Sequence, residues 1–375
     1  MDLNELRTGI DRIDSQMLEL FEKRMELCKN VALYKKENNL PIFQSDREVQ
    51  IIEKIRNRTK NPDLKNGTSA LFTSIMDISK YLQQQEIMKN EPDINFIPIE
   101  NLENAKRIGC QGTSGANSET ASMMIFKNKP ITFYQTFEDV FRAVENGDVD
   151  YGIIPVQNST AGSVTPAYDL MRKYDFHIVR SVCVEITNCL AVKNDIKISD
   201  IKCVYSHPQA LSQCSDFIEK NNLKAQQYGN TATAAKFISE SDENLAVICS
   251  EECALHLGLK ILAKSISNFI PNYTKFICIS KDFQVLPDAD TISVILNISN
   301  TTGSLYRLLA KFLAGGMNLD RIESRPIKNG SFDAMFYLNF KGNIHEKNVQ
   351  NLIKGLENEL EYFKLLGAYK DYPEA

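Results

Sequence analysis

The start of the chain carries an apolar stripe of helical period that two cations interrupt. Its members recur at steps of three and four residues: Leu3, Leu6, Ile10, Ile13, Met17, Leu20, Leu27 and Val31. The period predicts one long amphipathic helix. Arg24 stands where the stripe calls for an apolar residue, and Lys35 points within about 20° of the same direction. Because two unpaired cations in a helix interface are costly, an anion is expected to meet them there. The alternative is pairing with carboxylates of neighbouring helices, or extension into water.

Two further helices are predicted, one beginning near Ser45 and one from Leu71 to about Gln85. Each brings polar groups to its apolar face, namely Glu48 with Arg47 beside it, Ser79 and Gln83. Glu48 has an alternative role, because Ser45-x-x-Glu48 is a capping box that would fix a helix start. Gln83 could be a core amide with satisfied hydrogen bonds. Together with Arg24 and Lys35, these residues predict a cation-rich pocket in a helical bundle, shaped for a small polyanion that carries a hydroxyl group.

Composition bounds the class of protein. The 375 residues suffice for two or three domains. Nine cysteines, an odd number with no Cys-x-x-Cys pair, indicate reduced thiols in a cytoplasmic protein. The four histidines have no metal-ligand spacing, so neither a metal nor another cofactor is expected. No apolar stretch has the pattern of a signal peptide or reaches membrane length. A net charge of -5 without any block of Lys or Arg argues against nucleic acid as a partner.

The stretch from about residue 85 to 106 is polar, marked by proline and without sustained period, which predicts a linker. Beyond it, short apolar runs alternate with helical stretches, which predicts an α/β region with a mixed or parallel sheet. Small and hydroxylated residues gather in the segments 109–118, 157–164, 206–214, 230–235 and 272–276. Glycine-rich turns before helix N-termini collect carboxylates through backbone N–H groups, so these segments predict one cleft. His207 fits either a general base or a residue that packs a turn before Pro208.

From Thr291 onward the pattern reads strand, helix, strand, strand, helix, strand. The predicted strands are 292–298, 318–326, 332–340 and 363–369, and the predicted helices are 305–314 and 348–360. This order predicts a ferredoxin-like α+β domain.

Residues 1 to about 88 resemble the all-helical chorismate mutases. The resemblance lies in Leu6-Arg7-x-x-Ile10-Asp11-x-x-Asp14, Glu22-Lys23-Arg24-Met25-Glu26-Leu27, Val31-Ala32-x-Tyr34-Lys35 and Arg47-Glu48. In that family chorismate rearranges to prephenate without a nucleophile or metal, so the pocket holds the reactive conformer and stabilises charge on the breaking ether bond.

The resemblance to the mutases implies a role for each pocket residue. Arg7, Arg24 and Arg47 would hold the two carboxylates. Lys35 and Gln83 would donate hydrogen bonds to the ether oxygen, and Glu48 would take the ring hydroxyl with Ser79 nearby. The resemblance also implies an intertwined dimer in which the first helix of the partner supplies Arg7. Gln44 departs from the family pattern, because enteric members carry Asp at this position. The difference bears on how the ring hydroxyl of the substrate is recognised.

Residues 105 to about 282 resemble prephenate dehydratases, whose two α/β lobes, like those of periplasmic binding proteins, enclose the site. The family reaction expels carbon dioxide and water from prephenate to give phenylpyruvate. The resemblance implies that Thr274 protonates or orients the departing hydroxyl. It implies further prephenate-binding residues: Ser118, Asn158, Ser159, Gln213, Thr231 and Lys275. Two positions depart from the family pattern, because Gln157 replaces the usual Glu and Lys275 the usual Arg. Gln cannot ionise, and Lys cannot form the planar bidentate fork of Arg.

The C-terminal region resembles a regulatory ACT domain. Gly303-Ser304-Leu305-Tyr306 and Glu323-Ser324-Arg325-Pro326 match the two motifs by which dehydratases of this kind bind phenylalanine. The resemblance implies an allosteric phenylalanine site between two such domains, made by Gly303, Ser304, Leu305, Glu323, Ser324, Arg325 and Pro326. For Glu323 and Arg325 the alternative is an exposed cross-strand ion pair.

The three resemblances follow one another as in enzymes that fuse both activities. We therefore expect a helical mutase domain at 1–88, a linker at 89–104, a dehydratase domain at 105–282 and a regulatory domain at 288–375. The implied protein converts chorismate through prephenate to phenylpyruvate, is inhibited by phenylalanine, and forms a homodimer or higher homo-oligomer. The alternative is an active mutase whose weak or lapsed dehydratase region serves only as a phenylalanine-sensing binding module. Gln157 and Lys275 keep that alternative open.

Overall fold

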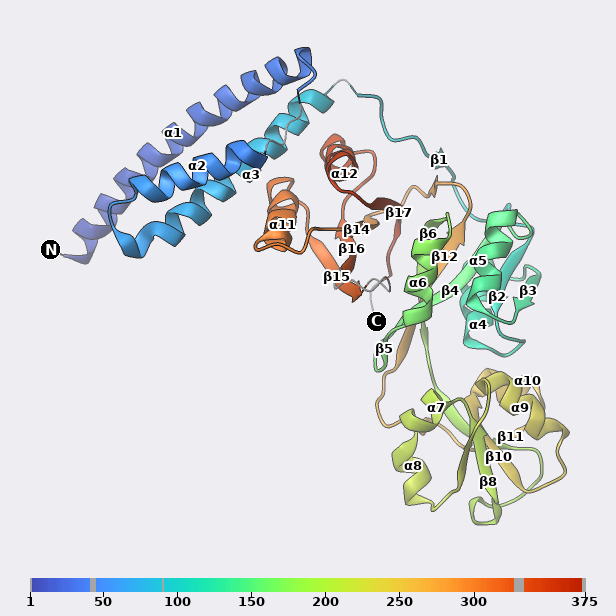
Figure 1. The fold of residues 1–375 in the computed structure, drawn as a ribbon. Coiled ribbons are helices and arrows are strands. Elements are labelled where there is room, and N and C mark those ends of the chain that lie inside the picture. Colours follow the sequence, from blue (N-terminus) through green and yellow to red (C-terminus); the bar gives the residue numbers. More distant parts are fainter. Residues whose placement is uncertain (1, 41–44, 90, 327–333, 373–375) are drawn as a thin grey trace. The chain divides into compact units, whose positions relative to one another are not determined.

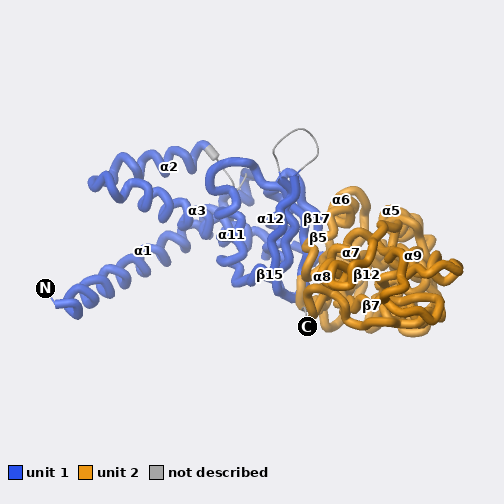
Figure 2. The backbone as a smooth tube through the Cα atoms, turned by 90° about the horizontal axis from the view of Figure 1, so that it is seen from below, with its two compact units in different colours: residues 1–94, 292–365 blue, residues 95–291, 366–375 orange. Residues whose placement is uncertain are grey.

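The computed structural model describes residues 2–40, 45–89, 91–326 and 334–372. The chain forms two compact units (Figure 2). One unit combines residues 1–94 with 292–365, and the other combines 95–291 with 366–375. The N-terminal helices therefore share a unit with most of the C-terminal region. Within the described ranges, no helix is both long and apolar enough to cross a lipid bilayer.

Three helices form the N-terminal part of the first unit (Figure 1). They are α1 (Leu3–Glu37), α2 (Ser45–Arg58) and α3 (Lys65–Met88), and the 3-10 turn η1 (Pro62–Leu64) leads into α3. α1 and α2 both pack against α3. α1 ends just before Asn39, which adopts a left-handed conformation, and cationic Lys35 and Lys36 occupy its last turn, where the helix dipole favours them. α3 begins earlier than its apolar period indicates, because Lys65 to Ala70 carry no apolar stripe.

The apolar stripe of α1 is largely uncovered within the single chain. Met25 and Ala32 are the buried residues of α1. The stripe residues that the sequence singles out are between 44% and 66% exposed: Leu3, Leu6, Ile10, Ile13, Met17, Leu20, Leu27 and Val31. An exposed apolar face of this length is unusual for a monomer, and such faces often take part in protein–protein contacts.

The second unit has two lobes, each built on a sheet (Figure 1). The sheet of the first lobe has the order β17 (its residues 366–370), β6, β12, β4, β2, β3. Its members are β2 (Ile108–Gln111), β3 (Ile131–Tyr134), β4 (Tyr151–Asn158), β6 (His177–Glu185), β12 (Tyr273–Ser280) and β17 (Phe363–Lys370), with β5 (Gly162–Ser163) beside β4. The helices of this lobe are α4 (Asn117–Phe126), α5 (Phe137–Asn146) and α6 (Thr165–Lys173). β2 pairs in parallel with β3 and β4, whereas β12 is antiparallel to β4 and β6, so the sheet is mixed.

The sheet of the second lobe has the order β11, β7, β10, β8, β9. Its members are β7 (Asn188–Val192), β8 (Cys203–Ser206), β9 (Ala225–Gln227), β10 (Leu245–Ser250) and β11 (Lys260–Ala263). The helices are α7 (Pro208–Gln213), α8 (Ser215–Lys220), α9 (Thr231–Glu240) and α10 (Glu251–His256), with the 3-10 turn η2 (Ile198–Asp200). Residues 245–249 of the central strand β10 are all buried, which explains their continuous apolar run.

The predicted linker holds a short strand. β1 (Ile97–Pro98) pairs in parallel with β13 (Gln284–Val285). The backbone N–H of Ile97 donates to the carbonyl of Phe283 (2.8 Å). The stretch before the first lobe is thus held against the strand that follows β12.

The C-terminal region has the predicted order of elements. These are β14 (Thr291–Asn297), α11 (Ser304–Ala314), β15 (Leu319–Pro326), β16 (Ala334–Lys341), α12 (Lys347–Glu359) and β17. The third predicted strand begins at Phe332, which lies outside the described residues, and its described part is β16. β15 is the edge strand of the order β15, β16, β14, β17. α11 and α12 also pack against α3.

Candidate active sites

The first candidate site lies where α3 meets α1 and α2. Arg24 of α1 donates a hydrogen bond to the hydroxyl of Ser79 on α3, and that hydroxyl donates to the carbonyl of Ile75 (2.6 Å). Gln83 follows Ser79 by one helical turn and is only 7% exposed. Its Oε1 has no hydrogen-bond partner among the described residues. A buried amide oxygen without a partner is costly, so this position is suited to a ligand.

Lys35 and Glu48 contribute opposite charges to the same site. Partial burial lowers the pKa of Lys35 below its ordinary value, although the nearby charges of Glu48 and Cys28 oppose this effect. The attraction between Lys35 of α1 and Glu48 of α2 links the two helices that flank α3. Five predicted residues therefore border one region: Arg24, Lys35, Glu48, Ser79 and Gln83.

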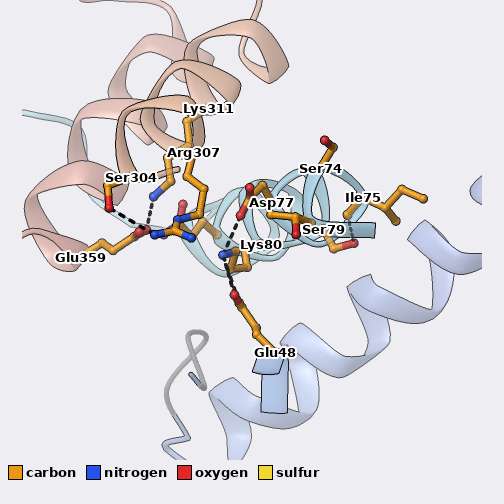
Figure 3. A network of polar contacts seen from close by, with 12 residues as sticks. Glu48, Ser74, Ile75, Asp77, Ser79, Lys80, Ser304, Arg307, Lys311 and Glu359 are labelled. Atoms are coloured by element: carbon orange, nitrogen blue, oxygen red, sulfur yellow. Dashed lines mark hydrogen bonds and ion pairs between the residues drawn. The ribbon is translucent and has the colours of Figure 1, made fainter. Parts of the chain in front are cut away.

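Two charged residues that the sequence analysis did not identify join this site (Figure 3). Lys80 of α3 forms ion pairs with Glu48 of α2 (Nζ to Oε1, 3.0 Å) and with Asp77 of α3 (Nζ to Oδ1, 2.8 Å). The side chains of Lys80 and Asp77 are 9% and 1% exposed. The available signal was the spacing of Asp77 and Lys80 by three residues within 71–81, a stretch with no other charged residue.

The remaining predicted positions are Arg7, Arg47 and Gln44. Arg7 and Arg47 have exposed side chains in the single chain. Gln44 lies outside the described residues, as does the side chain of Ser45, so the expected capping box at Glu48 falls there as well.

The second candidate site is a cleft of about 240 Å³ between the two lobes of the second unit. The first lobe contributes Ser118, Asn158 and Thr274, and the second contributes Gln213 and Thr231. Further polar lining residues are Gln111, Asn117, Asn188, His207, Gln209, Asn230 and Ser250. The sequence analysis did not single out Asn188 or Ser250, because each becomes part of the cleft only when the lobes fold together.

Asn158 organises the floor of the cleft and is 4% exposed. Its Nδ2 donates to the hydroxyl oxygen of Thr274 (3.0 Å) and to the side-chain oxygen of Asn272 (2.8 Å). Its Oδ1 accepts hydrogen bonds from Thr160 (2.8 Å) and from Gln213 (3.4 Å). Thr274 and Asn158 are register partners on β12 and β4, which explains their approach. Because the Thr274 oxygen accepts from Asn158, its own proton can be donated into the cleft.

None of the described residues that line the cleft carries an ionised side chain. Two helices of ten residues begin at its wall, α4 with Asn117 and Ser118 and α9 with Thr231. Helix N-termini present backbone N–H groups and the positive end of the helix dipole. The arrangement is suited to a carboxylate ligand.

His207 also lines the cleft, but its ring is engaged in a turn. Nδ1 accepts a hydrogen bond from the backbone N–H of Gln209 (3.2 Å), which caps α7. Burial lowers the pKa of His207, so the imidazole is neutral at pH 7. These contacts match the turn-packing interpretation.

Ser159 and Lys275 are absent from the described lining of the cleft. Ser159 accepts a hydrogen bond from the backbone N–H of Tyr273 (2.9 Å). The ammonium of Lys275 forms an ion pair with Asp371, just after β17 (3.0 Å). Adjacent residues on a strand point to opposite faces, so Lys275 points away from the face that Thr274 presents to the cleft. The expectation that Ser159 and Lys275 line the cleft therefore differs from the structure.

The residues predicted to bind phenylalanine lie in two places in the C-terminal region. Gly303 precedes α11 with φ of +83°, and the buried hydroxyl of Ser304 contacts Thr301 (2.6 Å) and Ser299 (3.1 Å). Leu305 is 40% exposed. On the edge strand β15, Glu323 lies 3.3 Å from Arg321 and 3.9 Å from Arg325, and Ser324 and Pro326 belong to the same strand.

Comparisons with known proteins identify the two regions that hold these sites. Residues 6–84 match the family described as chorismate mutase type II, and residues 108–284 match the prephenate dehydratase family. A bifunctional chorismate mutase/prephenate dehydratase of Aquifex aeolicus is 31% identical over 98% of each chain. The Escherichia coli protein with the same description is 28% identical, over 97% of this chain and 95% of the other. A prephenate dehydratase of Arthrobacter aurescens, solved in complex with L-Phe, covers 71% of this chain and 90% of its own, with 26% identity and a TM-score of 0.65.

The helical region and the two-lobed region thus define an enzyme with two catalytic domains. The chain belongs to the family of bifunctional chorismate mutase/prephenate dehydratases. It combines an isomerase and a lyase activity of aromatic amino acid biosynthesis.

Proposed function

We propose that the α1–α3 pocket performs the mutase step with Arg24, Lys35, Glu48, Ser79 and Gln83. Arg24 and Ser79 bind a carboxylate of chorismate, and Glu48 accepts a hydrogen bond from the ring hydroxyl. Lys35 and the Gln83 amide, turned so that its N–H faces the ligand, donate to the ether oxygen as negative charge develops there. What supports this assignment above all is the hydrogen bond from Arg24 on α1 to Ser79 on α3, one helical turn from the buried amide of Gln83.

The inter-lobe cleft performs the dehydratase step. As the carboxyl group of prephenate leaves as carbon dioxide, the electrons of the broken C–C bond move into the ring and the ring hydroxyl departs. Thr274, oriented by Asn158, gives its hydroxyl proton to the departing group, which leaves as water, and Thr274 takes a proton back from solvent water. The N-termini of α4 and α9 hold the carboxylates. The supporting observation is the Asn158 to Thr274 hydrogen bond at the cleft.

The alternative of a lapsed dehydratase rests on Gln157 and Lys275. Neither residue is among the described residues that line the cleft, which favours a dehydratase that has kept its catalytic activity. The deciding assay adds prephenate to the pure protein and measures phenylpyruvate by its absorbance in alkali. We expect phenylpyruvate to form with turnover, and absence of turnover would support the binding-module alternative.

We propose that two copies of the chain pair through the exposed stripe of α1, with Arg7 of each copy completing the pocket of the other. The support is the uncovered apolar face together with the exposed Arg7 on the same helix. Burial of such a face is strongly favourable.

A mixing experiment tests the shared pocket. Arg7→Ala and Lys35→Ala variants should each lose mutase activity alone. Co-expressed with two different tags and purified through both tags in turn, the mixed dimers should have about one half of wild-type activity, because one of their two pockets is intact. Chorismate consumption measures the recovery, and a mixture as inactive as its components would contradict the shared pocket.

The C-terminal region binds phenylalanine and lowers dehydratase turnover in this proposal. Gly303 opens α11 in a left-handed conformation that favours glycine, and the helix N-terminus behind it can hold an amino-acid carboxylate. The edge of β15, which carries Glu323 to Pro326, can meet a second copy of the domain. A cytoplasmic location fits the nine free thiols.

Calorimetric titration of phenylalanine tests this site. Wild type should bind phenylalanine, and bind it more weakly when prephenate is present, because the two ligands are linked reciprocally. Gly303→Val should weaken binding. A Cβ at Gly303 meets no atom within 4 Å, so a side chain fits there within the chain itself. Asn tolerates a positive φ better than Val does, so the Gly303→Asn variant separates the effect of backbone strain from steric block of the ligand. Lack of binding by wild type would leave a structural domain.

A further inference from the structure

A chain of three alternating charges crosses the contact of α2 and α3: Asp77, Lys80 and Glu48 (Figure 3). Lys80 lies between the two carboxylates and is 7% exposed. It approaches both oxygens of Glu48, Oε1 at 3.0 Å and Oε2 at 3.3 Å. Burial would lower the pKa of Lys80, but its hydrogen bond to Asp77 and the charges of Asp77 and Glu48 outweigh it and raise the pKa. Lys80 is therefore a permanent cation at neutral pH.

The two carboxylates differ in what they can reach. Asp77 is 2% exposed, whereas the side chain of Glu48 is 25% exposed and borders the mutase pocket beside Lys35. Asp77 fixes Lys80 from within α3, and Lys80 in turn fixes Glu48 from across the helix contact. Glu48 is long and flexible, and without this contact its carboxylate would sample several rotamers.

We propose that Lys80 is a positioning residue for the mutase reaction, which holds the Glu48 carboxylate where it meets the ring hydroxyl of chorismate. This inference rests on the proposed role of Glu48. Lys80 holds the carboxylate from α3 by a contact to each oxygen, and lone pairs that Lys80 does not use remain for the ring hydroxyl of the substrate. Lys80 acts through Glu48, in contrast to Lys35, which donates to the substrate directly.

A double-mutant cycle on the full-length protein tests the inference, with chorismate as the substrate. Lys80→Met keeps the length and apolar stem of the side chain and removes its charge. It should lower kcat/KM for chorismate by about tenfold in the wild-type background. In the Glu48→Gln background, Lys80→Met should change kcat/KM less than twofold, because the carboxylate that Lys80 positions is already lost. Lys80→Arg should restore most of the activity.

Controls separate positioning from a loss of fold. Lys80→Met leaves the buried Asp77 without its cation, so Lys80→Met/Asp77→Leu provides a second variant in which no buried charge remains. Lys311→Met is the matched control, because Lys311 is 5% exposed and ion-paired to Glu359 without contacting Glu48. Lys311→Met should leave chorismate turnover unchanged, and every variant should form phenylpyruvate from added prephenate at the wild-type rate.

Each result decides the question. An equal loss from Lys80→Met in both backgrounds would show a general structural role and overturn the inference. Full activity of both Lys80→Met and the double variant, with strong loss in Glu48→Gln, would overturn it as well and leave the role of Glu48 intact. Wild-type activity in Glu48→Gln alone would instead refute the proposed hydroxyl contact from which the inference starts.

Discussion

Thr274→Ala is expected to lower phenylpyruvate formation by about 100- to 10,000-fold, the range for loss of a positioned proton donor. The hydroxyl oxygen of Thr274 accepts from Asn158, which leaves its proton for donation to a ligand in the cleft. Steady-state assays with prephenate measure the loss.

Two controls accompany this measurement. Thr274→Ser retains the hydroxyl and should keep most of the turnover. Chorismate consumption by Thr274→Ala should equal that of wild type, because the mutase residues lie on α1, α2 and α3. An undiminished rate of phenylpyruvate formation in Thr274→Ala would exclude a catalytic role for this residue.

Lys35→Ala is expected to lower mutase kcat by about 100- to 1,000-fold, the range for loss of one preorganised donor to a developing negative charge. Partial burial makes the Lys35 ammonium less well hydrated, which strengthens its interaction with the ether oxygen. Chorismate consumption by the full-length protein measures the effect.

The matched comparison is Lys36→Ala on the next position of α1. Lys36 is exposed and donates to the carbonyl of Ile87 (2.8 Å), so its loss removes a cation without removing a pocket group. Lys36→Ala should retain wild-type turnover, and Lys35→Ala should still form phenylpyruvate from prephenate. Mutase activity near wild type in Lys35→Ala would refute the pocket assignment.

The sequence predicts helices and strands well in segments where a single hydrophobic period dominates. The stripe of α1 and the strand-helix order after Thr291 are both present in the structure. Interruptions of a stripe also reveal Ser79 and Gln83, because a polar residue on an apolar face stands out within a single helix. Lys80 does not stand out in this way. Its importance comes from Glu48 on another helix, and helical period carries no information about contacts between helices.

The residue Lys275 shows a second limit of sequence reasoning. The family motif suggests substrate binding, but the partner of Lys275 is Asp371, 96 residues away. Lys275 and Gln157 are register partners on β12 and β4, so both departures from the family pattern fall at one cross-strand position. The usual Glu and Arg would face each other there as an ion pair. In this chain Gln157 is neutral and the cation pairs with Asp371 instead.

This ion pair limits how the gene can be recombined with those of its relatives. A chimera that joins residues up to 290 of this chain to the C-terminal region of a relative without an acid at position 371 would leave the buried ammonium of Lys275 without its carboxylate. The reverse chimera joins a relative's residues up to position 290 to the C-terminal region of this chain. It would place Asp371 beside the relative's Arg, which already faces the relative's Glu. Exchange of the C-terminal region between homologues should therefore succeed when positions 157, 275 and 371 are inherited together.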